Sequence, residues 1–149
     1  MKKVLTLCLL LFSILSFNYI LLNRSTIPPH FPEPKSQTVA RLDSNEIALG
    51  RVLFHDTRFS ADQLVSCASC HSPFNSFAHT DHSISHGVFD SVGRRNAPAL
   101  FNLAWQDVFM HDGAAHNLQA QSIAPLTSAT EMGTTLQNVL TALNSSPLY

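Results

Sequence analysis

Two segments of the chain carry apolar residues at helical spacing. In the C-terminal segment these residues follow the i, i+3, i+4, i+7 pattern of one helix face: Leu136, Val139, Leu140 and Leu143. Thr134 or Thr135 stands where the N-cap of that helix is expected. The earlier segment opens on Asp43 and Glu46, spaced as in a capping box, and predicts a helix that ends near Asp56. Its apolar positions are Ile47, Leu49, Leu53 and Phe54.

The pattern between these two helices is irregular. It predicts short helices at about 67–72, over 98–105, and from Asn117 to roughly Ile123. Residues 72–95 are rich in Ser, His, Asp and Gly and have few periodic apolar positions, which predicts a long loop packed on another surface. No segment stands out as a strand. We therefore expect an all-α, loop-rich domain.

The N-terminus has a different composition. Met1-Lys2-Lys3 is a basic start and residues 4–22 are almost wholly apolar, which indicates a secretory signal or a membrane anchor over 1–24. No clear small-x-small cleavage site follows, so cleavage and anchoring to the inner membrane both stay open. Residues 25–42 are proline-rich and predict a linker, which leaves 43–149 as the folded domain. Either reading of the leader places that domain in the periplasm.

The net charge of the chain without its leader bears on whether it binds nucleic acid. Without Lys2, Lys3 and Arg24 the chain keeps six basic and ten acidic residues, a formal charge of −4. An acidic domain without a basic patch argues against nucleic-acid binding.

Cys67-Ala68-Ser69-Cys70-His71 has the C-x-x-C-H spacing of a c-type haem attachment site. Two thiols three positions apart lie on one side of a helical turn, where both can add to the vinyl groups of one porphyrin as thioethers. The histidine that follows is placed to coordinate the iron. The motif therefore predicts one covalent haem c and a redox protein.

Three other readings of the cysteines exist. A thioredoxin-like pair would need a βαβ pattern around it, which the sequence lacks. A zinc site of Cys67, Cys70, His82 and His86 is one residue short of the usual finger spacing and has no basic recognition face. A structural disulfide is the third reading. We favour haem.

Several short motifs follow one another in an order that resembles the N-terminal haem domain of bacterial di-haem cytochrome c peroxidases. They are Leu49-Gly50-Arg51-Val52-Leu53-Phe54, the C-x-x-C-H site, Ser85-His86-Gly87, Arg95-Asn96-Ala97-Pro98, Asp112-Gly113, Gln121 and Glu131-Met132-Gly133. The resemblance covers about residues 45–149 and implies a cytochrome-c-like fold. In that family the N-terminal haem reduces hydrogen peroxide and the haem of a second domain passes electrons to it.

The resemblance implies roles for single residues. Cys67 and Cys70 would hold the haem, and His71 would be the proximal ligand of the iron. His86 falls where the family often has a distal histidine that must leave before peroxide binds.

Polar residues of the family's distal face and domain interface have counterparts as well. Gln121 and Glu131 fall at distal positions, where a carboxyl can act as the acid–base group of peroxide reduction. Asn96 falls where the family has a calcium ligand. Without the resemblance, Glu131 reads equally as a helix-start carboxylate, Gln121 as a surface amide and His86 as a loop histidine. Arg95 is either a surface cation or the partner of a haem propionate.

Two departures from the family pattern stand out. His111 occupies the position before Asp-Gly where the family usually has a tryptophan between the haems, and Ala114 follows where Arg or Gly is common. The sequence also contains a single C-x-x-C-H motif, so we expect either a fragment of a longer protein or a truncated gene product.

The main hypothesis is a peroxidase that reduces hydrogen peroxide with electrons from a small c-type cytochrome or cupredoxin. The alternative is a single-haem electron carrier or non-catalytic haem-binding protein, with His86, Met110 or Met132 as permanent sixth ligand. A third reading is a related haem enzyme that oxidises side chains of a partner protein. Calcium binding and a homodimer are further expectations that the resemblance raises.

Overall fold

The structure is a computed structural model that describes residues 27–35, 43–147 and 149. The chain divides into two compact units, residues 1–33 and 34–149. The described part of the first unit is a turn closed by the Phe31 N–H, which donates to the Pro28 carbonyl at 2.9 Å. The predicted leader, 1–24, and part of the predicted linker lie outside the described residues. Among the residues that are described, no helix is long and apolar enough to cross a membrane.

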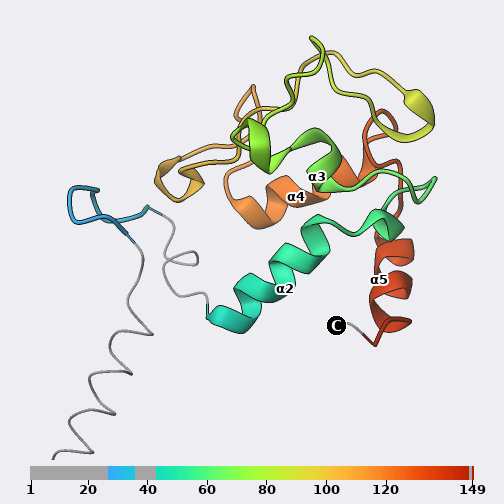
Figure 1. The fold of residues 1–149 in the computed structure, drawn as a ribbon, viewed down its shortest axis with the longest axis horizontal. Coiled ribbons are helices and arrows are strands. Elements are labelled where there is room, and N and C mark those ends of the chain that lie inside the picture. Colours follow the sequence, from blue (N-terminus) through green and yellow to red (C-terminus); the bar gives the residue numbers. More distant parts are fainter. Residues whose placement is uncertain (1–26, 36–42, 148) are drawn as a thin grey trace, which may run out of the picture. The chain divides into compact units, whose positions relative to one another are not determined.

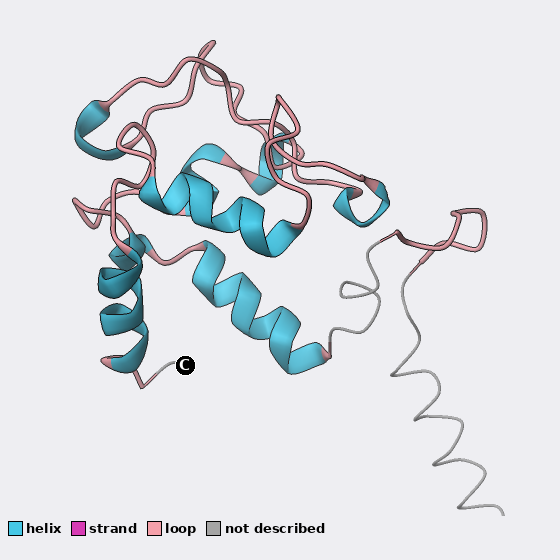
Figure 2. Cartoon of the chain, turned by 180° about the vertical axis from the view of Figure 1, so that it is seen from behind, coloured by secondary structure: helices cyan, strands magenta, loops and turns pink. Residues whose placement is uncertain are grey.

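The second unit is built from helices joined by long loops (Figure 1). Its helices are α2 (Ser44–Phe54), α3 (Cys67–Cys70), α4 (Leu118–Thr127) and α5 (Leu136–Asn144). Short 3-10 turns occur at Thr57–Phe59, Pro73–Asn75, Val88–Asp90 and Leu103–Trp105. Loop dominates between α3 and α4 (Figure 2), where three isolated antiparallel bridges take the place of any strand in the described ranges. The all-α, loop-rich prediction is confirmed for these residues.

Helix α2 begins at the capping box that the sequence predicts. The Asp43 carboxylate accepts from the backbone N–H of Asn45 at 2.7 Å and of Glu46 at 2.9 Å, and the Glu46 carboxylate accepts from the Asp43 N–H at 2.9 Å. Because three otherwise unpaired backbone donors find acceptors, the helix start is well defined.

The two C-terminal helices also begin where the sequence predicts, each at a capping side chain. Asn117 accepts from the Ala120 N–H at 2.7 Å at the start of α4, and Thr135 accepts from the Asn138 N–H at the start of α5. Helix α4 runs past the predicted end to Thr127, with Pro125 inside it. Its last carbonyls are satisfied from outside the helix, since the Met132 N–H donates to the Pro125 carbonyl at 3.1 Å.

The helix predicted over 98–105 is wrong except for its last three residues. Residues 98–102 are irregular, and Asn102 has a left-handed backbone with φ of 57°. A right-handed helix cannot continue through that conformation, so only the 3-10 turn Leu103–Trp105 forms.

Buried apolar side chains of the described residues come from loops and 3-10 turns instead of the long helices. They are Phe59, Val88, Ala104, Phe109, Ala115 and Met132. None of the residues of α2, α4 or α5 is buried. A domain of this length normally gains most of its stability from burying apolar side chains. Because few are buried here and many are exposed, a bound apolar group would find apolar side chains to pack against.

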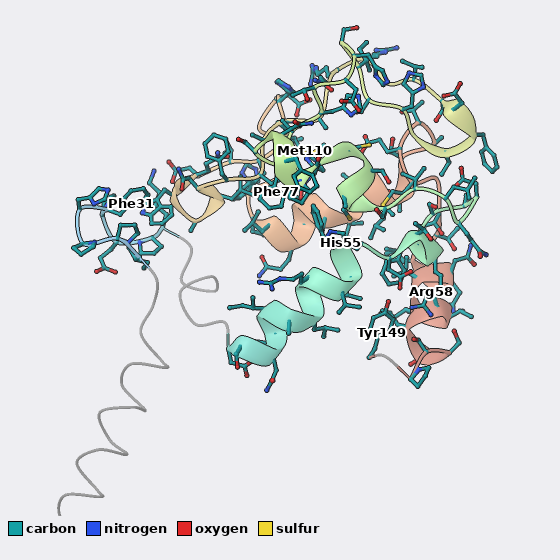
Figure 3. All side chains as sticks on the ribbon, in the orientation of Figure 1. Phe31, His55, Arg58, Phe77, Met110 and Tyr149 are labelled. Atoms are coloured by element: carbon teal, nitrogen blue, oxygen red, sulfur yellow. The ribbon has the colours of Figure 1, made fainter. Side chains whose placement is uncertain are left out.

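A polar cluster joins the 3-10 turn Thr57–Phe59 to the C-terminal residue (Figure 3). The Arg58 guanidinium donates to both Asp56 carboxylate oxygens, the shortest contact being 2.6 Å, and to the Tyr149 hydroxyl at 2.9 Å. The Tyr149 hydroxyl in turn donates to Asp56. The hydrogen bond from Arg58 is the main reason that the pKa of Asp56 lies well below its ordinary value.

The Asp56→Asn variant should lower the free energy of unfolding at neutral pH by about 1–2 kcal/mol, because it loses a hydrogen bond between charged groups. The figure is kept low because the Arg58 side chain is 38% exposed, so solvent screens the pair. The pKa of the folded carboxyl is depressed, so its contribution is present above the ordinary pKa and is lost as pH falls below about 4. Urea unfolding at pH 7 and at a series of pH values below 4 should therefore show the difference between the two proteins shrink progressively as pH falls. Asp81→Asn, in an exposed loop, is the matched control. A difference that stays the same over the whole acid series would contradict the assignment.

Candidate haem site

Helix α3 places the two cysteines of the motif on one helical turn. Its start is held locally, since the Ser66 N–H donates to the Ser69 hydroxyl at 3.0 Å. Cys67 and Cys70 are free and partly buried. Burial raises the pKa of both thiols. A redox-active C-x-x-C pair needs a lowered thiol pKa, so the thioredoxin-like alternative finds no support.

The zinc and disulfide alternatives find no support either. Within the described ranges, no three His, Cys, Asp or Glu side chains are grouped so that they could hold a metal ion. The two cysteines are free thiols and form no disulfide. Thioether attachment is the reading that the arrangement of α3 fits.

His71 ends α3 and presents one ring nitrogen for coordination. Its Nδ1 lies 2.8 Å from the Phe77 carbonyl oxygen. A carbonyl only accepts, so Nδ1 carries the proton and Nε2 keeps a free lone pair. Metal-bound histidines are oriented in this way by a backbone acceptor. The turn that supplies the carbonyl has left-handed residues at Ser76 and Phe77, and the Phe77 N–H donates back to the Ser72 carbonyl at 2.8 Å (Figure 3).

A cleft of about 840 Å³ lies beside α3, within the size range of cofactor sites. Seven of the eight residues predicted for the site line it: Cys70, His71, His86, Arg95, Asn96, Gln121 and Glu131. Cys67 is not in the lining. Apolar side chains complete the wall, among them Val92, Leu100, Leu103, Phe109 and Leu118. One cleft thus contains a thiol, an oriented imidazole and an apolar wall, and these groups suit a covalently attached haem.

His86 lies in a loop that is closed on itself. The His86 and Val92 backbones form an antiparallel bridge, and the Gly87 N–H donates to the Ser91 carbonyl at 2.8 Å. The Nδ1 of His86 forms an ion pair or hydrogen bond with the Asp90 carboxylate. An imidazole held at Nδ1 by a carboxylate has its Nε2 available, as a distal ligand requires.

The His86 loop is packed directly on the backbone at Glu131. The Val88 N–H donates to the Glu131 carbonyl at 2.7 Å. A Cβ added at Gly87 would lie 2.2 Å from the Thr130 carbonyl oxygen and 2.5 Å from that of Glu131, so only glycine fits there. Val88 is 2% exposed. The two candidate distal residues, His86 and Glu131, are therefore held by one shared backbone contact.

Glu131 and Gln121 reach the cleft from different elements. Gln121 lies on α4, and its Nε2 is 3.6 Å from the Met110 sulfur. Glu131 lies in the turn before α5, whose first residue is Leu136, so it is not a residue of the first helical turn. Glu131 is exposed and precedes α5, as the helix-start reading expects, so both that reading and its catalytic role stay predictions.

Arg95 and Asn96 lie in the cleft wall with their polar groups partly engaged. An Arg95 guanidinium nitrogen is 3.4 Å from the Asp112 carboxylate, and both side chains are exposed. The Asn96 amide donates to the His79 carbonyl at 2.8 Å, while its oxygen accepts from the Ala97 N–H at 2.9 Å. The propionate role of Arg95 and the calcium role of Asn96 stay predictions.

Sequence reasoning did not find three features of the site. They are the contacts of Asp90 with His86, of the Phe77 carbonyl with His71 and of Met110 with Gln121. Only Asp90 had a local signal, since it follows His86 by four residues. His111, singled out as a departure from the family pattern, does line the cleft.

Comparisons with known proteins agree with this geometry. The family model described as di-haem cytochrome c peroxidase matches residues 44–149. The chain is 36% identical over 128 residues to the methylamine utilization protein MauG of Methylorubrum extorquens, covering 82% of this chain and 33% of that protein. It is 38% identical over 112 residues to the cytochrome c peroxidase Ccp of Escherichia coli, covering 74% of this chain and 24% of that protein.

A solved structure is also similar. The crystal structure of a MauG-like protein associated with microbial copper homeostasis superposes with a TM-score of 0.74 at 26% identity, covering 85% of this chain and 37% of that one. The chain thus spans a third or less of the length of these two curated relatives.

Changing Cys67 and Cys70 together to alanine should abolish covalent haem attachment, because no thioether can form. The measurement is haem staining on a denaturing gel after expression with a cytochrome c maturation system. Cys8→Ala, which lies outside the motif, should leave the staining unchanged. Staining that survives the double substitution would disprove the attachment site.

Gly87→Ala should destabilise the domain by about 1–3 kcal/mol, the usual cost of overpacking, because its methyl group would overlap the backbone of residues 130–131. Gly93→Ala is the matched control in the same loop, where the nearest atoms to an added Cβ are 3.9 Å away. Urea unfolding of the haem-loaded chain measures both. Equal stability of the two variants would show that the loop can move off Glu131 at no cost.

Proposed function

This chain belongs to the di-haem cytochrome c peroxidase family, and we propose that its domain is the haem domain at which hydrogen peroxide is reduced to water. The observation that carries the proposal is the cleft beside α3. It gathers the C-terminal cysteine and histidine of the C-x-x-C-H motif with His86, Gln121 and Glu131, which come from distant parts of the chain.

On this proposal Cys67 and Cys70 hold the haem and His71 coordinates its iron. The Phe77 carbonyl keeps the His71 proton on Nδ1 and so directs Nε2 to the metal. The bound haem supplies an iron that exchanges electrons and binds peroxide oxygen.

His86 is the proposed distal ligand of the resting site. The Asp90 carboxylate at its Nδ1 makes the imidazole a better ligand by fixing its tautomer. Peroxide needs that position, so His86 has to move away before reduction begins.

Glu131 and Gln121 are the proposed proton-handling pair. Reduction of one peroxide to two waters consumes two electrons and two protons. A Glu131 carboxyl that faces the cleft moves a proton between the two peroxide oxygens, and the Gln121 amide donates a hydrogen bond to the outer oxygen.

Arg95, Asn96 and the N-terminal leader have supporting roles in this proposal. The Arg95 guanidinium pairs with a haem propionate, in place of or in addition to Asp112. Asn96 contributes to a calcium site. The basic and apolar leader sends the domain to the periplasm, where a small c-type cytochrome or cupredoxin is the electron donor.

A single-haem electron carrier is the second candidate, and one observation favours it. His86 is held by Asp90, and Met110 also lines the cleft, so two side chains are available for permanent six-coordination. Met132 is 4% exposed and is not among the residues that line the cleft, which favours Met110 over it as a candidate. The electronic spectrum of the haem-loaded chain separates the two functions, because peroxide alters it only if the sixth ligand leaves.

Glu131→Gln should lower the rate of peroxide consumption by about 10²–10⁴, the usual weight of a positioned acid–base group. The spectrum of the resting haem should hardly change, because the substitution leaves the iron ligands in place. Stopped-flow mixing of the haem-loaded protein with peroxide and a reduced donor measures the rate. Glu46→Gln is the control, since glutamine also satisfies the capping box of α2. Equal rates for both variants would remove Glu131 from the mechanism.

A further inference from the structure

Met110 combines three properties that no other methionine of the described residues shares. It lines the cleft, it is 38% exposed, and its sulfur lies 3.6 Å from the Nε2 of Gln121. Met132, by contrast, is 4% exposed and lies outside the cleft wall.

The position of Met110 is fixed by its neighbour. Phe109 is 7% exposed, and its backbone forms the bridge with Ala115, with hydrogen bonds of 2.7 and 3.3 Å. Met110 follows with a left-handed backbone, φ of 69°. A buried anchor and a closed turn therefore hold the thioether of Met110, labelled in Figure 3, among the residues that line the cleft.

From this geometry we propose that Met110 is a modification site at which hydrogen peroxide in the cleft produces methionine sulfoxide. The sulfur attacks one peroxide oxygen, the O–O bond breaks, and the departing hydroxide takes the proton of the transferred hydroxyl to become water. Sulfur loses two electrons and peroxide gains them, so one thioether and one peroxide give one sulfoxide and one water. The inference rests on the proposed function, because that function brings peroxide to this cleft.

Oxidation also changes the partner of Met110. A thioether sulfur is a weak hydrogen-bond acceptor, whereas a sulfoxide oxygen is a strong one. The Gln121 amide that now contacts the sulfur would donate to the sulfoxide oxygen instead. The amide would then be withheld from peroxide, so oxidation of Met110 lowers turnover until a methionine sulfoxide reductase reverses it.

The test is peptide mass mapping of the haem-loaded chain after exposure to hydrogen peroxide without an electron donor. Met110 should gain one oxygen about ten times faster than Met132, the ratio of their exposed fractions, 38% and 4%. Methionine sulfoxide reductase should restore both the mass and the turnover rate. In Met110→Leu, exposure to peroxide should no longer lower the turnover rate by this route.

The outcomes separate this inference from the proposed function. Turnover without oxidation of Met110, or oxidation of Met132 at an equal rate, would overturn the inference alone. Oxidation of Met110 in a chain without turnover would support the inference and overturn the proposed function.

Discussion

Close packing of Gly87 and Val88 on the backbone of residues 130–133 holds the candidate site together. The Val88 N–H donates to the Glu131 carbonyl at 2.7 Å, and Gly87 leaves no room for a side chain. Because backbone atoms meet without intervening side chains, a shift of the His86 loop has to break this hydrogen bond or carry Glu131 with it. The distal ligand and the proton-handling carboxyl of the proposed site are thus parts of one mechanical unit.

This unit belongs to a domain in which few side chains are buried. The long helices contribute no buried residue, while Leu136 and Leu140 of α5 are 46% and 51% exposed. The conformation of the loops is stabilised by hydrogen bonds within their own backbone, such as the bridges at Ser72–Ala78 and Phe109–Ala115. A planar apolar cofactor in the cleft would add the burial that the side chains themselves do not supply.

Local chemistry made the helices and the cofactor predictable from the sequence. The capping side chains of Asp43, Asn117 and Thr135 bond backbone groups at most three residues away, and the C-x-x-C-H motif lies within one turn. Such short-range features can be recognised from residue spacing alone. The failures have two kinds of cause. The helix predicted over 98–105 is broken by the left-handed Asn102, a backbone conformation that the apolar pattern does not reveal. Helix α4 extends past its predicted end because residues 132–134 satisfy its last carbonyls. The site contacts of Met110 and Phe77 depend on loop closure, which no periodic pattern encodes.

The choice of the sixth iron ligand follows from the same loop contacts. His86 sits on a loop closed by its own bridge and held by Asp90, whereas Met110 sits on a turn anchored by buried Phe109. The His86 side chain is 42% exposed and can turn into solvent while the backbone of its loop stays on Glu131. Met110 is tied to Gln121, a residue of the proposed distal face, and its movement would disturb that face. Of the two proposed ligands, His86 is the one that can depart at lower cost, and the proposed reduction of peroxide requires a departing ligand.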